Sequence, residues 1–203
     1  MKQKRKSFSS GQGQLTGLPR QLKDNVADVH NFVAKWNKLN SKGFTQLTNV
    51  CDIKISLLSN NETNSFAPQY SSSLEEACDL LCETYKELEK VCTKLTNVSL
   101  KFAKLTKLDG AERPFVSWGA TDFASRSQEI CEMLQKELKV KKCIVENVAH
   151  VDHHVNVKDV NEFNKQCRDY LMFYSSCWLH QPYINEGKLG MLIHEMLMES
   201  GHA

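Results

Sequence analysis

The sequence predicts an all-α protein, an elongated helical bundle that contains a long antiparallel hairpin of coiled-coil type. Apolar residues recur in steps of three and four along most of the 203 residues, which is the spacing of one helical face. Two patterned segments, about 74–108 and about 122–149, are joined by a short link and should fold back on each other. No segment alternates in the manner of a strand.

Two helices are expected before the first loop. The first should end near Gly43, and Asp24 suits its electropositive N-terminal end. The second should begin after Thr45 and run to about residue 58. The apolar positions of these two helices are Leu22, Val26, Val29, Val33, Trp36, Leu47, Val50, Ile53, Leu57 and Leu58.

The first arm of the hairpin follows a polar segment, 59–73, which is expected to be a flexible loop. Ser73 and Glu76 match a capping box, so a helix about 50 Å long is expected behind them. Its heptad-like stripe is typical of coiled-coil packing. The stripe consists of Leu74, Cys78, Leu81, Tyr85, Leu88, Cys92 and Leu95.

The second arm of the hairpin should be capped by Thr121, after the link 109–120. Two shorter helices are expected behind it. The first of them should end at Pro182, and the last should be capped by Gly201. Their apolar positions are Val160, Phe163, Cys167, Tyr170, Tyr174, Trp178, Leu189, Leu192, Ile193, Met196 and Leu197.

The charge distribution divides the chain into a basic tail, expected to be disordered over 1–18, and a single helical domain over 19–203. Residues 1–23 carry a net charge of +6 and the remainder −4, which argues against direct sequence-specific nucleic acid binding by the helical body. The tail reads as a nuclear import signal or a weak phosphate-binding arm, with a solvated terminus as the alternative. Its basic residues are Lys2, Lys4, Arg5 and Lys6.

The sequence offers little for catalysis or for binding a metal or cofactor. Its eight cysteines form no C-x-x-C pair and, without a secretory signal, indicate a reducing compartment. His150 and His154 have metal-ligand spacing but lack further ligands, so a solvated loop is expected there. Cys177 and His180 lie near a helix C-terminus, where the dipole disfavours a thiolate. We therefore expect no enzyme, no cofactor, no metal and no membrane span.

Aromatic residues outside the regular stripes are candidate contacts for a partner protein. The alternative is that each of them closes an end of the bundle. Arg20-Gln21-Leu22 also fits the short R-x-L pattern by which cyclins recruit partners, although Leu22 begins the first apolar stripe and is better explained as core. The candidate partner-binding residues are Phe44, Phe115, Trp118 and Tyr183, together with Trp36 and Trp178 from the stripes and with His180.

Several blocks of the sequence resemble one known family. LKDNVADVHNFVAKWNKLNSKGFT, IKISLL, WLHQPYI and MLMESGH occur in the order found in the cyclin-dependent kinase-interacting protein (CINP) family. The resemblance spans residues 18–203 and is strongest over 22–58 and 177–202. The three loops 59–73, 109–120 and 150–158 depart from the family pattern, so the resemblance gives no support for partner contacts there.

The resemblance implies a non-catalytic nuclear adaptor with a cytoplasmic pool. Its implied partners are the cyclin-dependent kinase with cyclin, the Dbf-dependent kinase, origin and replisome proteins, and the ATR-interacting protein. It also implies a chromatin-associated AAA ATPase complex serving replisome protein turnover. The length of the hairpin favours a second helical subunit as a partner in that complex. The alternative is a ribosome biogenesis factor that acts with such an ATPase on the large ribosomal subunit.

None of the four prolines follows Ser or Thr, so the chain lacks the minimal site for a proline-directed kinase. We therefore expect a protein that binds such a kinase rather than one that is its substrate.

Overall fold

The computed structural model describes residues 17–59, 71–107, 117–157 and 159–202, which are helical almost throughout. The expected all-α fold is confirmed. The elements, in order, are α1 (Leu18–Ser59), α2 (Ser72–Leu105), α3 (Ala120–Asn147), the 3-10 segment η1 (Val148–His154), α4 (Val160–His180) and α5 (Glu186–Glu199).

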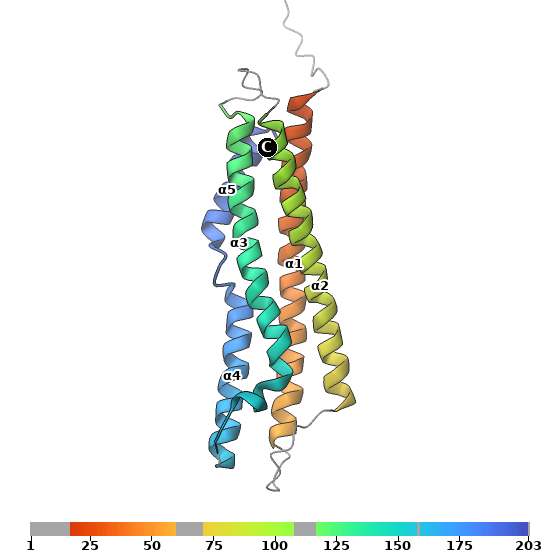
Figure 1. Ribbon diagram of the computed structural model, residues 1–203, viewed down its shortest axis with the longest axis vertical. Helices are drawn as coiled ribbons and strands as arrows, with labels where there is room; N and C mark the ends of the chain where they lie inside the picture. The colour runs from red at the N-terminus through yellow and green to blue at the C-terminus, as the bar shows by residue number, and fades with distance from the viewer. Residues whose placement is uncertain (1–16, 60–70, 108–116, 158, 203) are drawn as a thin grey trace, which may run out of the picture.

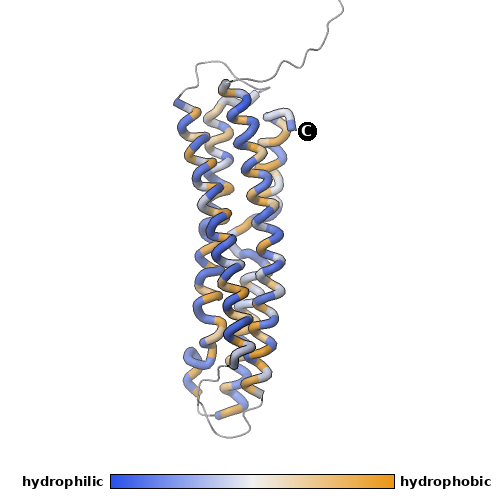
Figure 2. The backbone as a smooth tube through the Cα atoms, turned by 90° about the vertical axis from the view of Figure 1, so that its right-hand side faces the viewer, coloured by the Kyte–Doolittle hydropathy of each residue, from blue (hydrophilic) through white to orange (hydrophobic). Residues whose placement is uncertain are grey.

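The helices form an elongated antiparallel bundle in which the fourth position is shared by two helices. Figure 1 shows α1, α2 and α3 running alternately down, up and down, after which α4 and α5 run upward one after the other. α2 packs against α1 and α3, while α4 and α5 pack against the other sides of those two helices. Hydrophobic and hydrophilic positions alternate around every helix (Figure 2), as expected where each helix turns one face inward.

α1 is one continuous helix, so the prediction of two helices separated near Gly43 was wrong. Glycine in a helix interior costs about 1 kcal/mol relative to alanine, which makes it a natural but unreliable sign of a helix end. Here Gly43 is buried inside α1, and the ring of Trp178 from α4 packs directly on its backbone. Phe44 therefore lies within a helix and not in a turn.

α2 and α3 form the predicted hairpin and lie antiparallel, side by side (Figure 1). α2 begins earlier than expected because the N-cap is Ser71, whose Oγ accepts a hydrogen bond of 3.2 Å from the Leu74 amide. α3 also begins before Thr121, at Ala120. The expected loop 59–73 is correspondingly shorter, since its first residue belongs to α1 and its last two to α2.

The core runs along the axis of the bundle and joins all the helices. Two large rings stack between α2 and α3, where the centroids of Phe102 and Phe123 lie 6.1 Å apart at an interplanar angle of 8°. The side chains of every helix contribute to this core. Its fully buried members include Leu22, Trp36, Leu47, Leu74, Leu81, Leu88, Leu95, Leu134, Trp178 and Leu192.

The segment after α3 was expected to be a solvated loop over 150–158, but its first part is the 3-10 segment η1. An ion pair of 3.1 Å joins Asp152 of η1 to Lys54 of α1, whose side chain is 1% exposed. Val151 is buried beside them. Because Lys54 is enclosed in the core, this pair anchors η1 to the end of α1.

No helix within the described ranges is long and apolar enough to span a membrane.

Candidate partner-binding surface

The two sequence blocks around Trp36 and Trp178 meet in the middle of the bundle, although they are far apart in the chain. The Nε1 of Trp178 donates a hydrogen bond of 3.1 Å to the carbonyl oxygen of Asn40. The Nε1 of Trp36 donates one of 2.9 Å to the Oε1 of Gln181. Both indole N–H groups are therefore satisfied inside the protein, as buried tryptophans require.

A buried lysine lies between these two tryptophans. The Nζ of Lys141, on α3, donates to the Oδ1 of Asn40 at 2.6 Å and to the carbonyl oxygen of Trp178 at 3.3 Å. It also lies 4.4 Å from the ring centroid of Trp178, within cation–π range. Burial disfavours the charged form and lowers the pKa of Lys141 from 10.5 to about 8.

The carboxylate partner of Lys141 is Glu137, one turn earlier on α3. Its Oε1 lies 3.4 Å from the lysine Nζ, and its Oε2 accepts a hydrogen bond of 3.1 Å from the Tyr183 amide. Burial raises the pKa of Glu137, and the Lys141 charge opposes that shift. The Tyr183 contact ties the break between α4 and α5 to α3. We call these groups the buried polar cluster, which comprises Trp36, Asn40, Glu137, Lys141, Trp178 and Gln181.

The structure corrects two of the sequence-based candidates, Trp36 and Trp178, and agrees with the core assignment of Leu22. Trp36 and Trp178 are 0% exposed, so they are core residues and not surface anchors for a partner. Leu22 is also 0% exposed, which leaves no cyclin-docking R-x-L element at Arg20 while α1 is folded. Arg20 itself is exposed and lies 3.8 Å from Asp24 on the same helix.

Phe44 is the predicted partner residue that lines a surface groove. This groove lies between α1 and α4 and has a volume of about 810 Å³. Besides Phe44, its apolar lining includes Ile55 from α1, and Met172 and Phe173 from α4. The side chains of Met172 and Phe173 are 66% and 61% exposed. Exposed apolar side chains grouped along a groove mark a surface for binding another protein. We call this the α1–α4 groove.

Met172 and Phe173 were not among the sequence-based candidates. The predicted inward stripe of α4 contained Tyr170 and Tyr174, and the two missed residues fall between them in the sequence. They could have been found because they are apolar residues outside the inward-facing stripe of their helix. Apolar residues of this kind were selected only in turns and not within helices. Tyr170 is itself 40% exposed, so the apolar surface of α4 is wider than one stripe.

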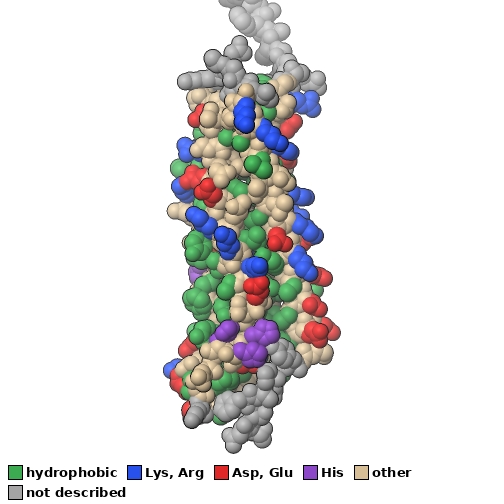
Figure 3. Space-filling model, in the orientation of Figure 1, with side chains coloured by type: hydrophobic (Ala, Val, Ile, Leu, Met, Phe, Trp, Pro, Cys, Tyr) green, Lys and Arg blue, Asp and Glu red, His purple; other side chains and the backbone are tan. Residues whose placement is uncertain are grey.

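The remaining candidates occupy separate places. His180 and Tyr183 are exposed at the end of α4 and in the following turn. Trp118 is half-buried before α3, with its ring 5.1 Å from that of Phe123 and 5.7 Å from the guanidinium of Arg126. In Figure 3, hydrophobic side chains gather along the left margin of the visible face, on the side where Figure 1 places α4 and α5. Phe115 and the basic residues Lys2, Lys4, Arg5 and Lys6 lie outside the described residues.

The two constellations considered for chemistry are not assembled as sites. Burial raises the pKa of the Cys177 thiol, and the nearby Glu137 raises it further. No hydrogen bond joins Cys177 to His180, the last residue of α4, within the described ranges. The exposed histidines His150, His153 and His154 gather on η1 at the lower end of Figure 3. Among the described residues, no three His, Cys, Asp or Glu side chains form a group able to hold a metal ion.

Comparison with known proteins finds relatives that match nearly the whole chain. The chain is 32% identical to the cyclin-dependent kinase 2-interacting proteins of Bos taurus and Homo sapiens, over 93% of its length and 92% of theirs. It is 28% identical to the Xenopus laevis protein over 93% of the chain and 91% of that protein. The chain belongs to the cyclin-dependent kinase 2-interacting protein family. No protein-family profile matches it.

Membership in the cyclin-dependent kinase 2-interacting protein family confirms the resemblance found in the sequence. The matches to these relatives extend well beyond the strongest blocks, since they cover nearly the whole chain. The names of these relatives describe proteins that interact with a cyclin-dependent kinase, and an interaction role is what the α1–α4 groove supports.

Proposed function

We propose that this chain is a non-catalytic adaptor that links cell-cycle kinases at replication origins and supports ATR checkpoint signalling. Its proposed partners are the cyclin-dependent kinase with its cyclin, the Dbf-dependent kinase, origin and replisome proteins, and the ATR-interacting protein. The observation that carries the proposal is membership in the cyclin-dependent kinase 2-interacting protein family over 93% of the chain. The proposed location is the nucleus, with a cytoplasmic pool.

The α1–α4 groove is the proposed contact for a second helical subunit in a chromatin-associated AAA ATPase complex. The groove is long, because Phe44 and Ile55 lie three helical turns apart along α1. Its lining is largely apolar. Asp52 and Asp169 also line it, one from each helix, and both are exposed. An amphipathic helix fits such a surface if an apolar stripe faces the groove and basic residues face the two aspartates.

Affinity purification of the tagged full-length chain from cells tests this proposal. We expect recovery of a cyclin-dependent kinase or replisome components together with an AAA ATPase. In the double variant Met172→Ser/Phe173→Ser, recovery of the helical subunit should fall at least about tenfold, because removal of a central apolar anchor costs 2 kcal/mol or more. Leu100→Ser is the matched control, since Leu100 is 55% exposed on α2, away from the groove.

Three outcomes would contradict parts of the proposal. Recovery of pre-ribosomal proteins with no kinase or replisome component would replace it with the alternative function, ribosome biogenesis with an AAA ATPase in large-subunit maturation. Equal loss of partners in the groove variant and in Leu100→Ser would remove the groove as their binding site. A catalytic function would be indicated if cells that carry Cys177→Ala lost the function of this chain while the recovery of its partners was unchanged.

The tail proposal has its own test. If Lys2, Lys4, Arg5 and Lys6 form an import signal, their joint replacement by alanine should shift a fluorescently tagged chain from nucleus to cytoplasm. An unchanged distribution would show that nuclear entry, if it occurs, relies on a partner or on another segment.

A further inference from the structure

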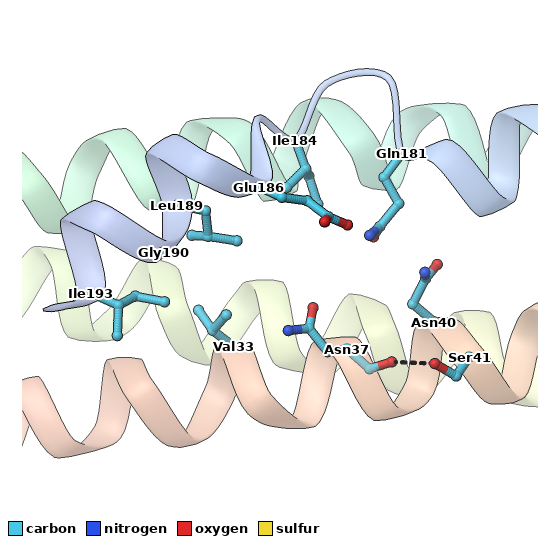
Figure 4. A pocket seen from close by; sticks show the side chains of 10 residues that line it. All are labelled: Val33, Asn37, Asn40, Ser41, Gln181, Ile184, Glu186, Leu189, Gly190 and Ile193. Carbon is cyan, nitrogen blue, oxygen red and sulfur yellow. Dashed lines mark hydrogen bonds between the residues drawn. The ribbon is translucent and has the colours of Figure 1, made fainter.

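A second hollow lies between α1 and α5, beside the turn that follows α4 (Figure 4). It has a volume of about 360 Å³ and shares no lining residue with the α1–α4 groove. Val33 of α1 and Leu189 and Ile193 of α5 belong to its apolar walls, whereas Asn37 and Ser41 of α1 are polar and uncharged. We call it the upper hollow, since α5 lies above α4 in Figure 1.

The upper hollow and the α1–α4 groove follow one face of α1. Seven of the α1 residues that line them recur in steps of three and four, which is the spacing of side chains along a single helical face. From the first of these residues to the last, α1 rises about 33 Å at 1.5 Å per residue. We call this continuous face the α1 seam. It consists of Val33, Asn37, Ser41, Phe44, Thr48, Asp52 and Ile55.

An exposed leucine of α4 lies between the two spaces. Leu179 is 48% exposed and follows Met172 of the groove by two helical turns, so both side chains project from the same side of α4. It is also two residues before Gln181, which lines the upper hollow. Apolar surface therefore continues from the groove toward the upper hollow.

The charged residues that line the two spaces are all acidic. Asp52 and Asp169 line the groove, Glu186 lines the upper hollow, and no described lysine or arginine lines either of them. All three acidic residues are exposed, and none forms an ion pair with another described residue. The α1 seam therefore favours a basic partner. It disfavours a second copy of the chain docked through the same face, because the same carboxylates would then face each other.

A straight surface of this length fits a helix. A helix satisfies its main-chain hydrogen bonds internally, whereas an extended segment gains affinity by pairing with a strand edge, and the described residues contain no strand. We propose that a single basic amphipathic helix of a partner protein, about 22 residues long, lies along the α1 seam and crosses both the groove and the upper hollow. This inference rests on the proposed function, because it specifies the length and the charge of the helix that the α1–α4 groove receives.

The test is an NMR titration of the ¹⁵N-labelled full chain with a designed helical peptide of about 24 residues, which spans the seam at 1.5 Å per residue. Its leucines recur in steps of three and four, lysines flank them, and alanines fill the other positions. The main-chain amide signals of Thr48, in the groove, and Gly190, in the upper hollow, should shift together with one affinity.

Two further peptides of the same length separate charge from apolar length. A peptide with glutamate in place of every lysine should bind at least about tenfold more weakly, because its charges face the three carboxylates. A peptide with glutamine in place of leucine over one half should also bind at least about tenfold more weakly, because it has lost the anchors for one of the two spaces.

Two glycines of α5 provide a matched pair of variants. A β-carbon at Gly190, which lines the upper hollow, meets nothing within 4 Å, and one at Gly187, which lines neither space, meets only Asn185 Oδ1 at 3.6 Å. Both variants should therefore fold. Gly190→Arg puts a long cation into the upper hollow, so it should weaken binding of the lysine peptide at least about tenfold. Gly187→Arg should change that affinity little.

Three results would contradict the proposed helix. If only groove signals shift, or if the two glycine variants bind the lysine peptide equally, the helix ends at the groove and the extension is wrong, while the groove contact stands. Equal binding of the lysine and glutamate peptides would remove the charge preference. Absence of any saturable shift would remove the helix as the occupant. These titrations contain no cellular partner, so their failure leaves the adaptor function to the affinity purification.

Other occupants of the α1 seam have their own signatures. If joint replacement of Lys2, Lys4, Arg5 and Lys6 by alanine moves the Thr48 and Gly190 signals without peptide, the occupant is the basic tail of the chain. If the mass in sedimentation equilibrium rises with concentration, and Gly190→Arg abolishes that rise, the occupant is a second copy. Either result would replace the partner helix.

Discussion

Trp178 packs so tightly on Gly43 that a β-carbon added to the glycine would lie 2.4 Å from the Cζ2 of the indole ring. Gly43→Ala should therefore destabilise the protein by about 1–3 kcal/mol, the usual effect of overpacking a core. The gain in helix propensity, about 1 kcal/mol, offsets only part of this. Urea denaturation followed by circular dichroism measures the difference.

Gly190→Ala is the matched control, because Gly190 is also helical and a β-carbon there meets nothing within 4 Å. It should leave stability unchanged or raise it by up to about 1 kcal/mol. If Gly43→Ala were as stable as Gly190→Ala, the close contact between α1 and α4 would not exist in solution.

Removal of Lys141 should be strongly destabilising, since it leaves the buried carboxylate of Glu137 without its cation. We expect Lys141→Met to lower the free energy of unfolding by about 3 kcal/mol. The double variant Lys141→Met/Glu137→Gln removes both charges, so it should regain much of the lost stability. Lys142→Met is the control, because its ion pair with Glu146 is exposed and should contribute less than about 1 kcal/mol. Equal effects of the two lysine variants would contradict the buried pair.

The same lysine should make stability depend on alkaline pH. The pKa of Lys141 is lowered from 10.5 to about 8, first because burial disfavours its charge. Between these two values the unfolded chain holds a proton that the folded chain has released, so the free energy of unfolding rises with pH. The free energy of unfolding of the wild-type chain should therefore exceed that of Lys141→Met by an amount that grows from about pH 8 to about pH 10.5 and shrinks as the pH falls through that range. A constant difference, measured by urea denaturation, would show that the lysine titrates normally.

Helical periodicity was enough to predict the all-α fold and the hairpin, because amphipathic stripes follow directly from the residue order. It failed at Gly43, where a packing contact with Trp178 overrides the local tendency to end a helix. It also could not show that Lys141 and Glu137 lie inside, since charged residues are expected at the surface and their compensation comes from other helices.

The candidate site was predictable only in part, for a related reason. Phe44 follows the helix end expected at Gly43, yet it lines the α1–α4 groove from within a helix. Trp178 was also a candidate, and it is buried. Which apolar residues remain exposed depends on where α4 lies against α1, and a single helical stripe does not determine that placement.

The ion pair between Lys54 and Asp152 should determine whether η1 stays attached to α1. Asp152→Asn removes the charge that faces a lysine 1% exposed, so we expect a loss of about 3 kcal/mol. Hydrogen exchange of the amides in η1 should increase together with this loss. Asp79→Asn, at an exposed position on α2, is the control and should change neither quantity. Unaltered exchange in η1 would mean that other contacts, such as those of the buried Val148 and Val151, hold the segment without the ion pair.

The eight cysteines should react in an order set by burial. All are free thiols, and Cys143 alone is exposed. Burial raises the pKa of Cys92 to about 12 and that of Cys167 to about 11, so both are protonated and shielded at pH 8. With an aromatic disulfide reagent, the native protein should show one fast thiol that Cys143→Ser removes, whereas Cys92 and Cys167 should react only as the protein unfolds in urea. A fast phase that survives Cys143→Ser would place another thiol at the surface, and early loss of Cys92 or Cys167 would mean that the bundle opens locally around α2 or α4.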